Sequence, residues 1–356
     1  MPDCDVRRLP AKSDANRAAI IIPARNAERH IGRCLDAIQR ARGQFEIIVV
    51  DDASSDATAA IAETKSARVL RLPTQKGPSA SRNAGVDVCE ADIVIFVDAD
   101  VEVAPTSLAR MLGFLRCHSE YAAVFGSYDD SPGGPSTVSK YRDLIFHYRH
   151  QTGKIEADTF WSGFSAVRRK PFLSIGGFAP GRQDGIEDIE FGARLRAAHH
   201  RIALQRDLLC KHHKHWTLRG MIAIDLFKRA LPWSRLLLER KCWACDLNLH
   251  RDRRLGVALA GAAPIGVAAS VLDPLFIILA FASWTGAVLV DWNFFKFLWS
   301  KNRRLALAAL PLHLVHLSTA AAGFTLASLE HALRGISRRS RMRAGLFLSP
   351  PQHFGK

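Results

Sequence analysis

Several features that would assign this chain to a common class are missing from its sequence. It has neither a G-x-G-x-x-G turn after its first apolar run nor a G-x-x-x-x-G-K-S/T loop. Neither of the two common phosphate-binding loops is therefore expected. Residues 1–17 are polar and carry no apolar stretch of the signal-peptide type, so no signal peptide is expected.

Cysteine is sparse in a way that argues against a disulfide framework or a zinc site. The seven cysteines are an odd number, and most lie in periodic segments, which favours reduced thiols in a cytosolic core. Cys242 and Cys245 form a single C-x-x-C pair. A structural zinc site needs four ligands, and no second pair lies at a fitting spacing.

Negative charge is also scarce, with 34 acidic against 49 basic residues and a formal net charge of +15. Such a chain could bind nucleic acid, anionic lipid or a polyanionic substrate. The arginines gather beside long uncharged runs, at residues 251–254, 301–304 and 338–343. That placement favours lipid headgroups, and no nucleic-acid partner is expected.

The first 120 residues alternate between expected strands and helices. Apolar runs at 18–22, 45–50, 69–72 and 93–97 are separated by helical patterns that begin near residues 28, 57 and 78. This alternation predicts an α/β fold with a mostly parallel sheet and helices on both faces. Polar residues follow three of these strands: Arg25 and Asn26, Asp51 and Asp52, and Asp98 and Asp100. They are expected to converge on one edge of the sheet.

Asp98 and Asp100 directly follow the most apolar of these strands. On an extended backbone, residues two apart point to the same side. Two such carboxylates repel each other, but they suit a hard divalent cation that itself holds a phosphate. The alternative is a solvated turn after the strand.

Four motifs occur in order: residues 23–26 (PARN), 50–56 (VDDASSD), 77–85 (GPSASRNAG) and 97–100 (VDAD). Together they resemble the donor half of glycosyltransferase family 2, which comprises inverting enzymes of the GT-A fold. The resemblance covers roughly residues 17–240. It implies a GT-A sheet of the nucleotide-diphospho-sugar transferase type.

The resemblance also implies roles for single residues on the donor side. The nucleotide would be met by Pro23, Arg25, Asn26, Glu28, Asp51, Asp52, Lys76, Arg82 and Asp98. Either Asp51 or Asp52 would accept a hydrogen bond from the base. Arg82 would lie near the donor sugar and pyrophosphate, although by itself it also fits an ordinary helix surface.

Asp98 and Asp100 would hold Mg²⁺ or Mn²⁺ on the donor diphosphate. Family members often carry a histidine near the pyrophosphate and metal, and His212 is assigned that position. The alternative for the His-rich stretch 211–217 is a basic patch that faces lipid headgroups.

The acceptor side is implied by residues 160–169 and 175–178 and by the Glu187-Asp188 pair. Carboxylates in the first turn of a helix suit the helix dipole, which is the structural alternative. In the family, the second residue of such a pair is the general base, so Asp188 is assigned that role. Gly163, Glu187 and Trp216 are expected on the acceptor side.

Residues 225–233 lie where processive synthases of the family carry QxxRW, and that motif is absent. Transfer of one sugar or a few is therefore expected. Residues 217–240 fit either an amphipathic helix on the membrane surface or packing against the domain. The Gly- and Pro-rich stretch 128–140 fits either a lid or a linker.

Residues 255–290 carry one charge, Asp273, which is followed by Pro274. Since a span needs about 20 residues, two short spans are expected, at 255–272 and 275–290. A third uncharged run covers 305–329. Flanking basic residues place both ends of the hairpin in the cytosol. Three full spans conflict with a cytosolic basic tail, so one run is re-entrant or interfacial, or the tail breaks the rule. Soluble core helices are the alternative.

The expected organisation is a polar tail (1–17), a GT-A domain (18–240, with donor half 18–127 and acceptor half 128–240), a membrane region (251–335) and a basic tail (336–356). The expected function is an inverting transferase, anchored in the bacterial inner membrane with a cytoplasmic catalytic domain. It would move a sugar from a nucleotide donor, expected to be UDP-linked, to a hydroxyl of a lipid or lipid-linked glycan. A catalytically inactive scaffold is the alternative.

Overall fold

The computed structural model describes residues 17–41, 43, 45–179, 185–240 and 250–346. Nearly all of the polar tail, the Cys242/Cys245 pair and the end of the basic tail lie outside these residues. Cys34, Cys89 and Cys210 are buried free thiols, as expected. Cys117 departs from that expectation because it is disulfide-bonded.

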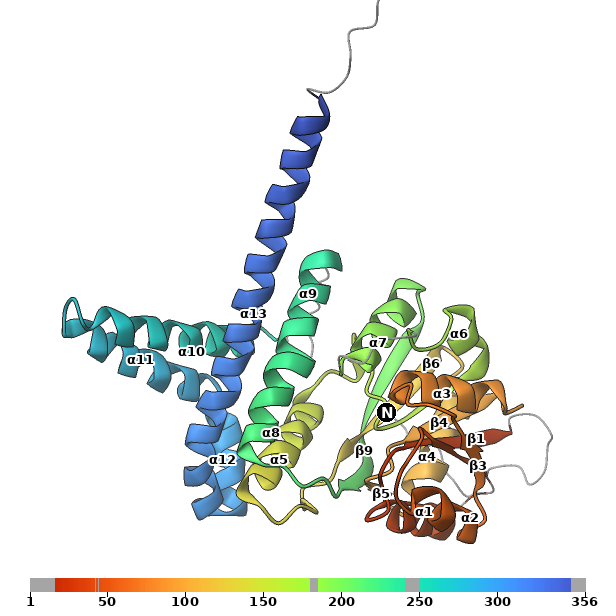
Figure 1. Cartoon of the computed structure of the whole chain (residues 1–356). Helices are drawn as coiled ribbons and strands as arrows, with labels where there is room; N and C mark the ends of the chain where they lie inside the picture. The colour runs from red at the N-terminus through yellow and green to blue at the C-terminus, as the bar shows by residue number, and fades with distance from the viewer. Residues whose placement is uncertain (1–16, 42, 44, 180–184, 241–249, 347–356) are drawn as a thin grey trace, which may run out of the picture.

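One half of the central sheet is parallel, as the alternation of elements predicts (Figure 1). Its strands are β1 (Ala18–Ala24), β2 (Glu46–Asp51), β3 (Arg68–Arg71) and β4 (Ile93–Val97). They lie in the order β3-β2-β1-β4. Ile20 and Ile22 of β1 pack into one core while Ile21 packs into the other. This alternation explains why the strand reads as one apolar run: both faces of the sheet are covered.

The other half of the sheet is mixed. Its strands are β5 (Val101–Val103), β6 (Tyr121–Tyr128), β7 (Glu156–Ala157), β8 (Phe164–Arg168) and β9 (Arg201–His212). β8 lies antiparallel between β4 and β6, and β9 runs parallel to β6. β5 and β7 pair antiparallel with β9. The α/β fold is therefore confirmed, with the parallel pairing confined mainly to the N-terminal strands.

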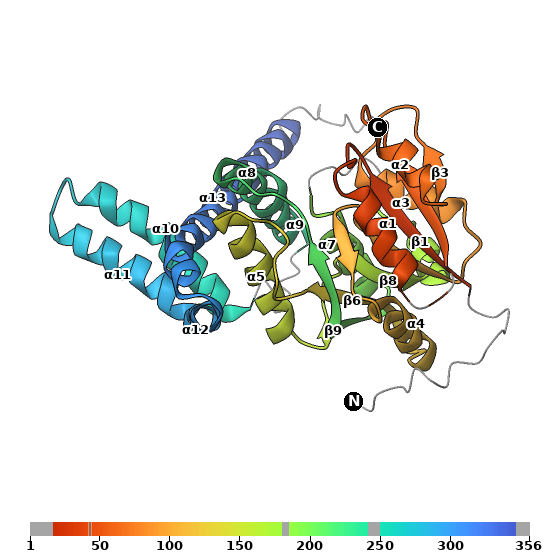
Figure 2. The same cartoon turned by 90° about the horizontal axis from the view of Figure 1, so that it is seen from below.

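Helices cover both faces of this sheet (Figure 2). The helices that pack around the sheet are α1 (Ile31–Arg40), α2 (Thr58–Thr64), α3 (Pro78–Asp87), α4 (Ser107–Cys117), α6 (Arg169–Ser174) and α7 (Glu187–Ala197). α1 and α4 contribute to one core, and α3, α6 and α7 to the other. Gly85 lets α3 approach the sheet, because a Cβ there would lie 2.5 Å from the Ile21 side chain.

The remaining helices form a unit beside the sheet. They are α5 (Thr137–Thr152), α8 (Leu218–Ala223), the π-helix η2 (Ile224–Ala230), α9 (Leu231–Arg240), α10 (Arg251–Ala269), α11 (Leu275–Val290), α12 (Trp292–Lys301) and α13 (Arg303–Leu346). A separate core joins α5, α8, α12 and α13. α10 and α11 form a hairpin that projects away from the sheet (Figure 1).

By length and composition, one described helix could cross a membrane, Arg303–Arg334 within α13. α11 and α12 would pass the same test together, but they meet at a bend of 66°. The Asp-Pro turn expected between two short apolar segments is present between α10 and α11. There, the Leu275 N–H donates to the Asp273 carboxylate at 2.9 Å.

A buried ion pair links three helices of this helical unit. Arg142 of α5 is 0% exposed, and its Nη1 donates to both Asp225 carboxylate oxygens of η2 at 2.6 and 2.7 Å. His316 of α13 lies 2.8 Å from the same carboxylate. Three helices that are far apart in the sequence therefore meet at one buried charge.

Replacing Arg142 with methionine is expected to lower the free energy of unfolding by about 3 kcal/mol, because it leaves a buried carboxylate short of its counter-charge. Denaturant unfolding of the full chain measures this. The double variant Arg142→Met/Asp225→Asn removes both charges and should recover most of the loss. A double variant as unstable as the single one would contradict the proposed cause.

Candidate functional site

The loops after β1 and β2 are tied to each other. Asn26 adopts a left-handed conformation (φ 47°), and its Oδ1 accepts a hydrogen bond from Ser55 N at 2.9 Å. Glu28 Oε2 accepts one from Ala57 N at 3.2 Å. Arg25, between these loops and the strand end, is exposed, and Pro23 is half-buried in β1. Asn26 and Glu28 thus shape the rim of the expected nucleotide site.

Asp51 and Asp52 differ in what their carboxylates contact. Asp52 accepts hydrogen bonds from Lys76 N at 2.7 Å and from Gly77 N at 2.8 Å, one on each oxygen. It holds the loop before α3, where Gly77 has the positive φ of 87° that favours glycine. Asp51 accepts a bond from Ser54 N at 3.3 Å. Of the two sequence candidates for a contact with the base, Asp51 has the less engaged carboxylate.

Arg82 of α3 is a buried centre of charge. It is 3% exposed, so the helix-surface alternative is wrong. Its Nη2 lies 2.7 Å from Asp98 Oδ1, and its Nη1 lies 3.4 Å from Glu187 Oε1. The guanidinium therefore links the end of β4 to the first turn of α7. This brings the expected donor-side and acceptor-side residues together.

Asp98 and Asp100 do not share one extended face as the spacing predicts. β4 ends at Val97 and the chain turns, with Val101 N donating to Asp98 O at 3.0 Å. Asp98 consequently faces Arg82, whereas Asp100 Oδ2 lies 3.7 Å from His212 Nε2. The turn defeats the two-residue periodicity, but both carboxylates stay at the same strand end.

His212, at the end of β9, is buried, so the headgroup-facing alternative is wrong. Its Nδ1 lies 2.8 Å from Asp143 Oδ1, and its ring stacks on Tyr128 with centroids 4.5 Å apart. Burial by itself would lower the pKa of His212, but the contacts with Asp100 and Asp143 raise it to about 9. Sequence analysis missed Asp143 and Tyr128; the only signal for Asp143 was a carboxylate next to the apolar Leu144 and Ile145 of α5.

Asp188 lies in the first turn of α7. Its Oδ1 accepts a hydrogen bond from Ile189 N at 2.8 Å, and its Oδ2 accepts a long one from Ser162 N at 3.4 Å. Burial and the neighbouring Glu187 raise the pKa of Asp188 to about 7, against the opposing effect of Arg82. A carboxylate with a pKa near the operating pH is suited to take a proton from a hydroxyl.

Gly163 and Trp216, the two other residues expected on the acceptor side, lie in different parts of the structure. The Gly163 carbonyl accepts a hydrogen bond from Asp98 N at 3.0 Å, and a Cβ at Gly163 would lie 2.6 Å from the Trp161 ring. Gly163 therefore lies against the strand end that carries Asp98. Trp216 packs on α5 instead, with its ring 4.8 Å from the Arg142 guanidinium.

Arg229 of η2 is a site residue to which sequence analysis gave no role. Its guanidinium lies over the Phe146 ring at 4.7 Å. Burial and Arg142 lower the pKa of Arg229 to about 10, while Asp225, Tyr128 and Asp188 act in the opposite direction. η2 also approaches the start of α7, since a Cβ at Gly185 would lie 2.7 Å from the Lys228 carbonyl oxygen. The η2 segment thus brings a positive charge into the electrostatic neighbourhood of Asp188.

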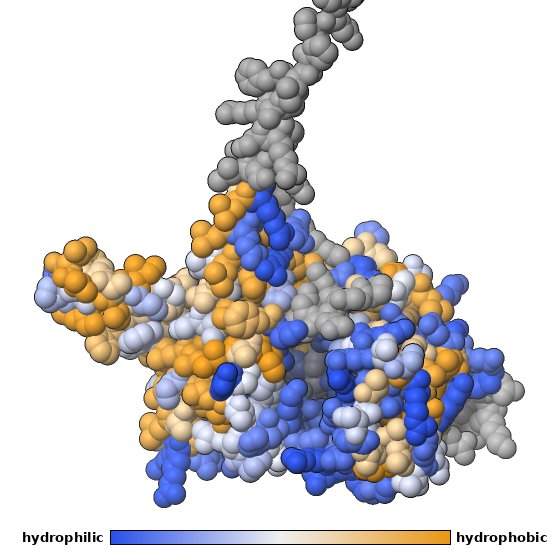
Figure 3. Space-filling model, in the orientation of Figure 1, coloured by the Kyte–Doolittle hydropathy of each residue, from blue (hydrophilic) through white to orange (hydrophobic). Residues whose placement is uncertain are grey.

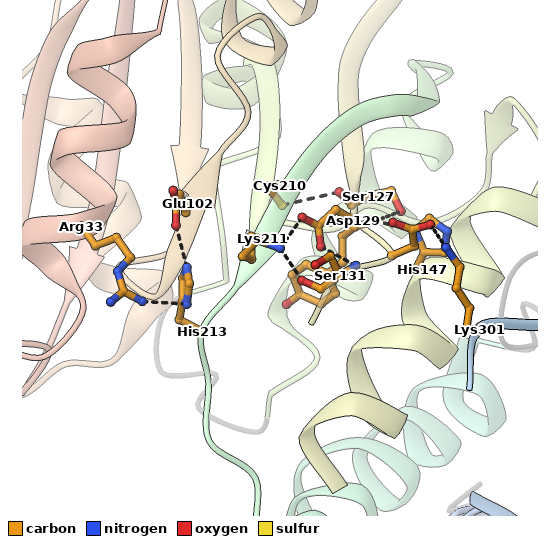
Figure 4. Close-up of polar contacts among 12 residues, drawn as sticks. Arg33, Glu102, Ser127, Asp129, Ser131, His147, Cys210, Lys211, His213 and Lys301 are labelled. Carbon is orange, nitrogen blue, oxygen red and sulfur yellow. Dashed lines mark hydrogen bonds and ion pairs between the residues drawn. The ribbon is translucent and has the colours of Figure 1, made fainter. Parts of the chain in front are cut away.

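Polar contacts fix the connection between the sheet and the helical unit (Figure 4). His213 lies 2.8 Å from Glu102 and 3.0 Å from Arg33, which ties the end of β9 to β5 and α1. On the other side, Lys211 pairs with Asp129 at 2.8 Å. The stretch 128–140 is further held by Gly133 N, which donates to the His212 carbonyl at 3.2 Å. In this structure, residues 128–140 are a linker that polar contacts hold against β9.

Among the residues described, no group of three His, Cys, Asp or Glu side chains forms a ready metal cage. Two carboxylates and an imidazole are nevertheless available: Asp98 and Asp100 follow β4, and His212 ends β9 with its Nε2 3.7 Å from Asp100 Oδ2. Mg²⁺ is commonly held by one or two carboxylates together with substrate phosphates, and not by an all-protein cage. The donor set therefore fits a cation whose coordination a diphosphate would complete.

Comparison with known proteins gives the same assignment as the motifs. The family model described as glycosyl transferase family 2 matches residues 19–176. A pre-mycofactocin glycosyltransferase from Mycobacterium tuberculosis is 28% identical over 231 residues, covering 62% of this chain and 47% of that protein. A 4,4'-diaponeurosporenoate glycosyltransferase from Staphylococcus haemolyticus is 37% identical over 91 residues, 24% of each chain. The chain thus spans about half the length of the first relative and about a quarter of the length of the second.

A solved structure extends the likeness of the fold to most of the chain. A mannosyltransferase from Pyrobaculum calidifontis, in complex with GDP-Man and Mn²⁺, superimposes with a TM-score of 0.57. The match covers 90% of this chain and 91% of that one, at 19% sequence identity. The fold is therefore of the GT-A type, and residues 19–176, which match the family model and carry the four ordered motifs, form a glycosyltransferase family 2 domain.

Proposed function

We propose that this chain is a metal-dependent, inverting glycosyltransferase that uses a nucleotide-sugar donor. The observation that carries the proposal is the cluster in which Arg82 bridges Asp98 and Glu187, with Asp188 beside it. A buried cation, a carboxylate at a strand end and a carboxyl group with a pKa near 7 are the groups that sugar transfer from a diphosphate needs. A purely structural ion pair would not require a carboxyl group with a raised pKa.

In the proposed reaction, an acceptor hydroxyl attacks the anomeric carbon of the donor sugar. Asp188 takes the hydroxyl proton as the new C–O bond forms. The bond between the anomeric carbon and the diphosphate oxygen breaks, and the nucleoside diphosphate leaves with the electron pair. One displacement from the opposite side inverts the anomeric configuration.

The other residues would hold the donor for this step. Asp51 would contact the base, and Arg82 would face the sugar and diphosphate. Asp98, Asp100 and His212 would hold Mg²⁺ or Mn²⁺, which when bound would neutralise negative charge on the leaving diphosphate. A UDP-linked donor is proposed on family resemblance; GDP-Man is the donor bound by the structural neighbour from Pyrobaculum calidifontis.

We propose a lipid or lipid-linked glycan as the acceptor, with the protein anchored in the bacterial inner membrane and its catalytic domain in the cytoplasm. Two features support this. The C-terminal part carries apolar helices, with Leu272 of the α10–α11 turn 88% exposed. A relative from Staphylococcus haemolyticus is named a 4,4'-diaponeurosporenoate glycosyltransferase.

The decisive experiment offers membranes that carry this protein a panel of UDP- and GDP-sugars with Mn²⁺ or Mg²⁺ and added lipid extract. Metal-dependent release of nucleotide from one of these donors would support glycosyltransferase activity and identify the donor. No release with any donor, together with normal nucleotide binding, would favour the alternative of a non-catalytic scaffold. Soluble sugars accepted in place of lipid extract would overturn the lipid acceptor alone.

Arg229→Ala is expected to raise KM for the acceptor by about tenfold if that acceptor carries a phosphate, because the guanidinium is the charge that η2 brings close to Asp188. Arg229→Lys should recover part of the effect. Turnover against donor and acceptor concentrations separates the two substrates. A change in donor KM alone would contradict an acceptor-side position for Arg229.

A further inference from the structure

The long apolar helix α13 packs along the catalytic part of the chain. His313 Nδ1 lies 3.0 Å from Tyr141 Oη, and Ala309 is fully buried in the core shared with α5. Further along, a Cβ at Gly323 would lie 2.5 Å from the Ala230 side chain. One side of α13 therefore has protein neighbours, while Leu307, Phe324 and Leu326 on this helix are 57%, 40% and 42% exposed.

The next turns of α13 are joined to α9 by charges. Arg235 donates two hydrogen bonds of 2.7 Å to Glu330, and Arg334 lies 3.8 Å from Glu239. The Arg235 and Glu330 side chains are 40% and 37% exposed. These charges lie at the end of the apolar run 305–329. Near its middle, His316 lies 2.8 Å from Asp225, which pairs with Arg142. A membrane around this run would enclose that buried ion pair, which is costly.

The α10–α11 hairpin is more exposed, most of all around its turn. Its exposed apolar side chains include Val271 88%, Leu272 88%, Leu275 59%, Ile278 61%, Leu279 53% and Phe281 60%. Figure 3 shows this apolar surface at the projecting end of the hairpin. The two helices approach through small residues, since a Cβ at Gly266 would lie 3.1 Å from the Ala280 side chain. Close approach through small residues is typical of helix pairs in lipid.

Basic residues flank the hairpin at its base. Arg251 begins α10, and Lys296, Arg303 and Arg304 follow α11; all four are exposed. Their charge complements anionic headgroups, which attract basic residues next to a membrane segment. Three acidic residues lie between them along the chain, Asp252, Asp273 and Asp291, and of these Asp273 lies at the turn.

We infer that the α10–α11 hairpin is the lipid-embedded anchor of this protein and that α13 lies outside the hydrocarbon as a docking helix of the catalytic part. The inference rests on the proposed membrane association and assigns it to one element. The 16 residues of α11 reach about 24 Å, past the midplane of a core about 30 Å thick. The hairpin enters from the catalytic side, and its turn, with Asp273, approaches the far headgroups.

Flotation of the purified full-length chain with vesicles of phosphatidylcholine and phosphatidylglycerol tests this inference. The hairpin variant Ile278→Asp/Leu279→Asp is expected to lower the vesicle-bound fraction by roughly tenfold or more, since a central carboxylate strongly opposes insertion. The matched control, Leu326→Asp/Leu329→Asp on α13, changes side chains that are 42% and 57% exposed. It should float like the unchanged protein.

Release of the α13 variant with retention of the hairpin variant would overturn the inference and make α13 the span. Retention of both variants would also overturn it, because the anchor would then lie elsewhere. A hairpin variant that floats normally but changes from dimer to monomer in sedimentation would assign the apolar surface to a second copy of the chain. Flotation does not depend on turnover, so a protein that floats but releases no nucleotide would count against the proposed function alone.

Discussion

Replacing Asp188 with asparagine is expected to lower sugar transfer by about 10³-fold, the middle of the range for loss of a general base. Donor binding should be unchanged, because the amide keeps the shape of the side chain. Nucleotide release under saturating donor measures turnover, and protection by donor in thermal unfolding measures binding. Asp87→Asn, at the exposed C-terminal end of α3, is the matched control and should leave both unchanged.

The same carboxylate predicts the pH dependence. With its pKa raised to about 7, Asp188 is protonated below neutral pH and cannot accept a proton. The value of kcat/KM should therefore rise about tenfold per unit up to roughly pH 7 and level off above it. A flat profile between pH 5 and 8 would contradict Asp188 as the base.

Stability should change in the opposite sense to activity. The folded-state pKa of Asp188 lies above its unfolded value of about 3.9, so the folded chain holds the proton more tightly between those two values. The free energy of unfolding therefore decreases as the pH rises from about 4 to about 7. Asp188→Asn removes this decrease and should be more stable than the unchanged protein at pH 8 but not at pH 4. Equal stability at pH 8 would show that burial does not strain the ionised carboxylate.

Replacing Asp98 with asparagine is the second change with a large expected effect. Asp98 is assigned to the cation, and it lies 2.7 Å from the buried Arg82. Loss of its charge should weaken metal binding and lower turnover by about 10²-fold or more, since charge neutralisation on the leaving group is worth several kcal/mol. Nucleotide release titrated with Mn²⁺ measures both effects.

A binding measurement separates the cation role from a purely structural one. Mn²⁺ with nucleoside diphosphate should raise the melting temperature of the unchanged protein, because ligands that bind the folded state stabilise it. The Asp98→Asn variant should lose most of that increase. A variant with low activity but a normal response to Mn²⁺ would show that Asp98 only positions Arg82.

The resemblance of the motifs predicted the correct family and placed the important residues at one sheet edge. Arg82, Asp98 and Glu187 were assigned from separate motifs, and the structure joins them in one ion cluster. The two-residue spacing argument failed at Asp98 and Asp100, because the chain turns after Val97. Spacing arguments hold only while the backbone stays extended.

By itself, the sequence determined what its local patterns can express: the α/β class, the parallel strands β1 to β4, the family and the carboxylates at strand ends. Apolar periodicity reports whether a face is covered, but not by which element. Only the tertiary structure decided that His212 is buried against Asp143 and Tyr128 and that Arg229 approaches the site through a π-helix. It also decided that α13 packs on α5, η2, α9 and part of the α10–α11 hairpin, whose turn projects. The physical reason is that apolar residues facing protein and apolar residues facing lipid have the same composition, so contacts between distant segments alone distinguish them.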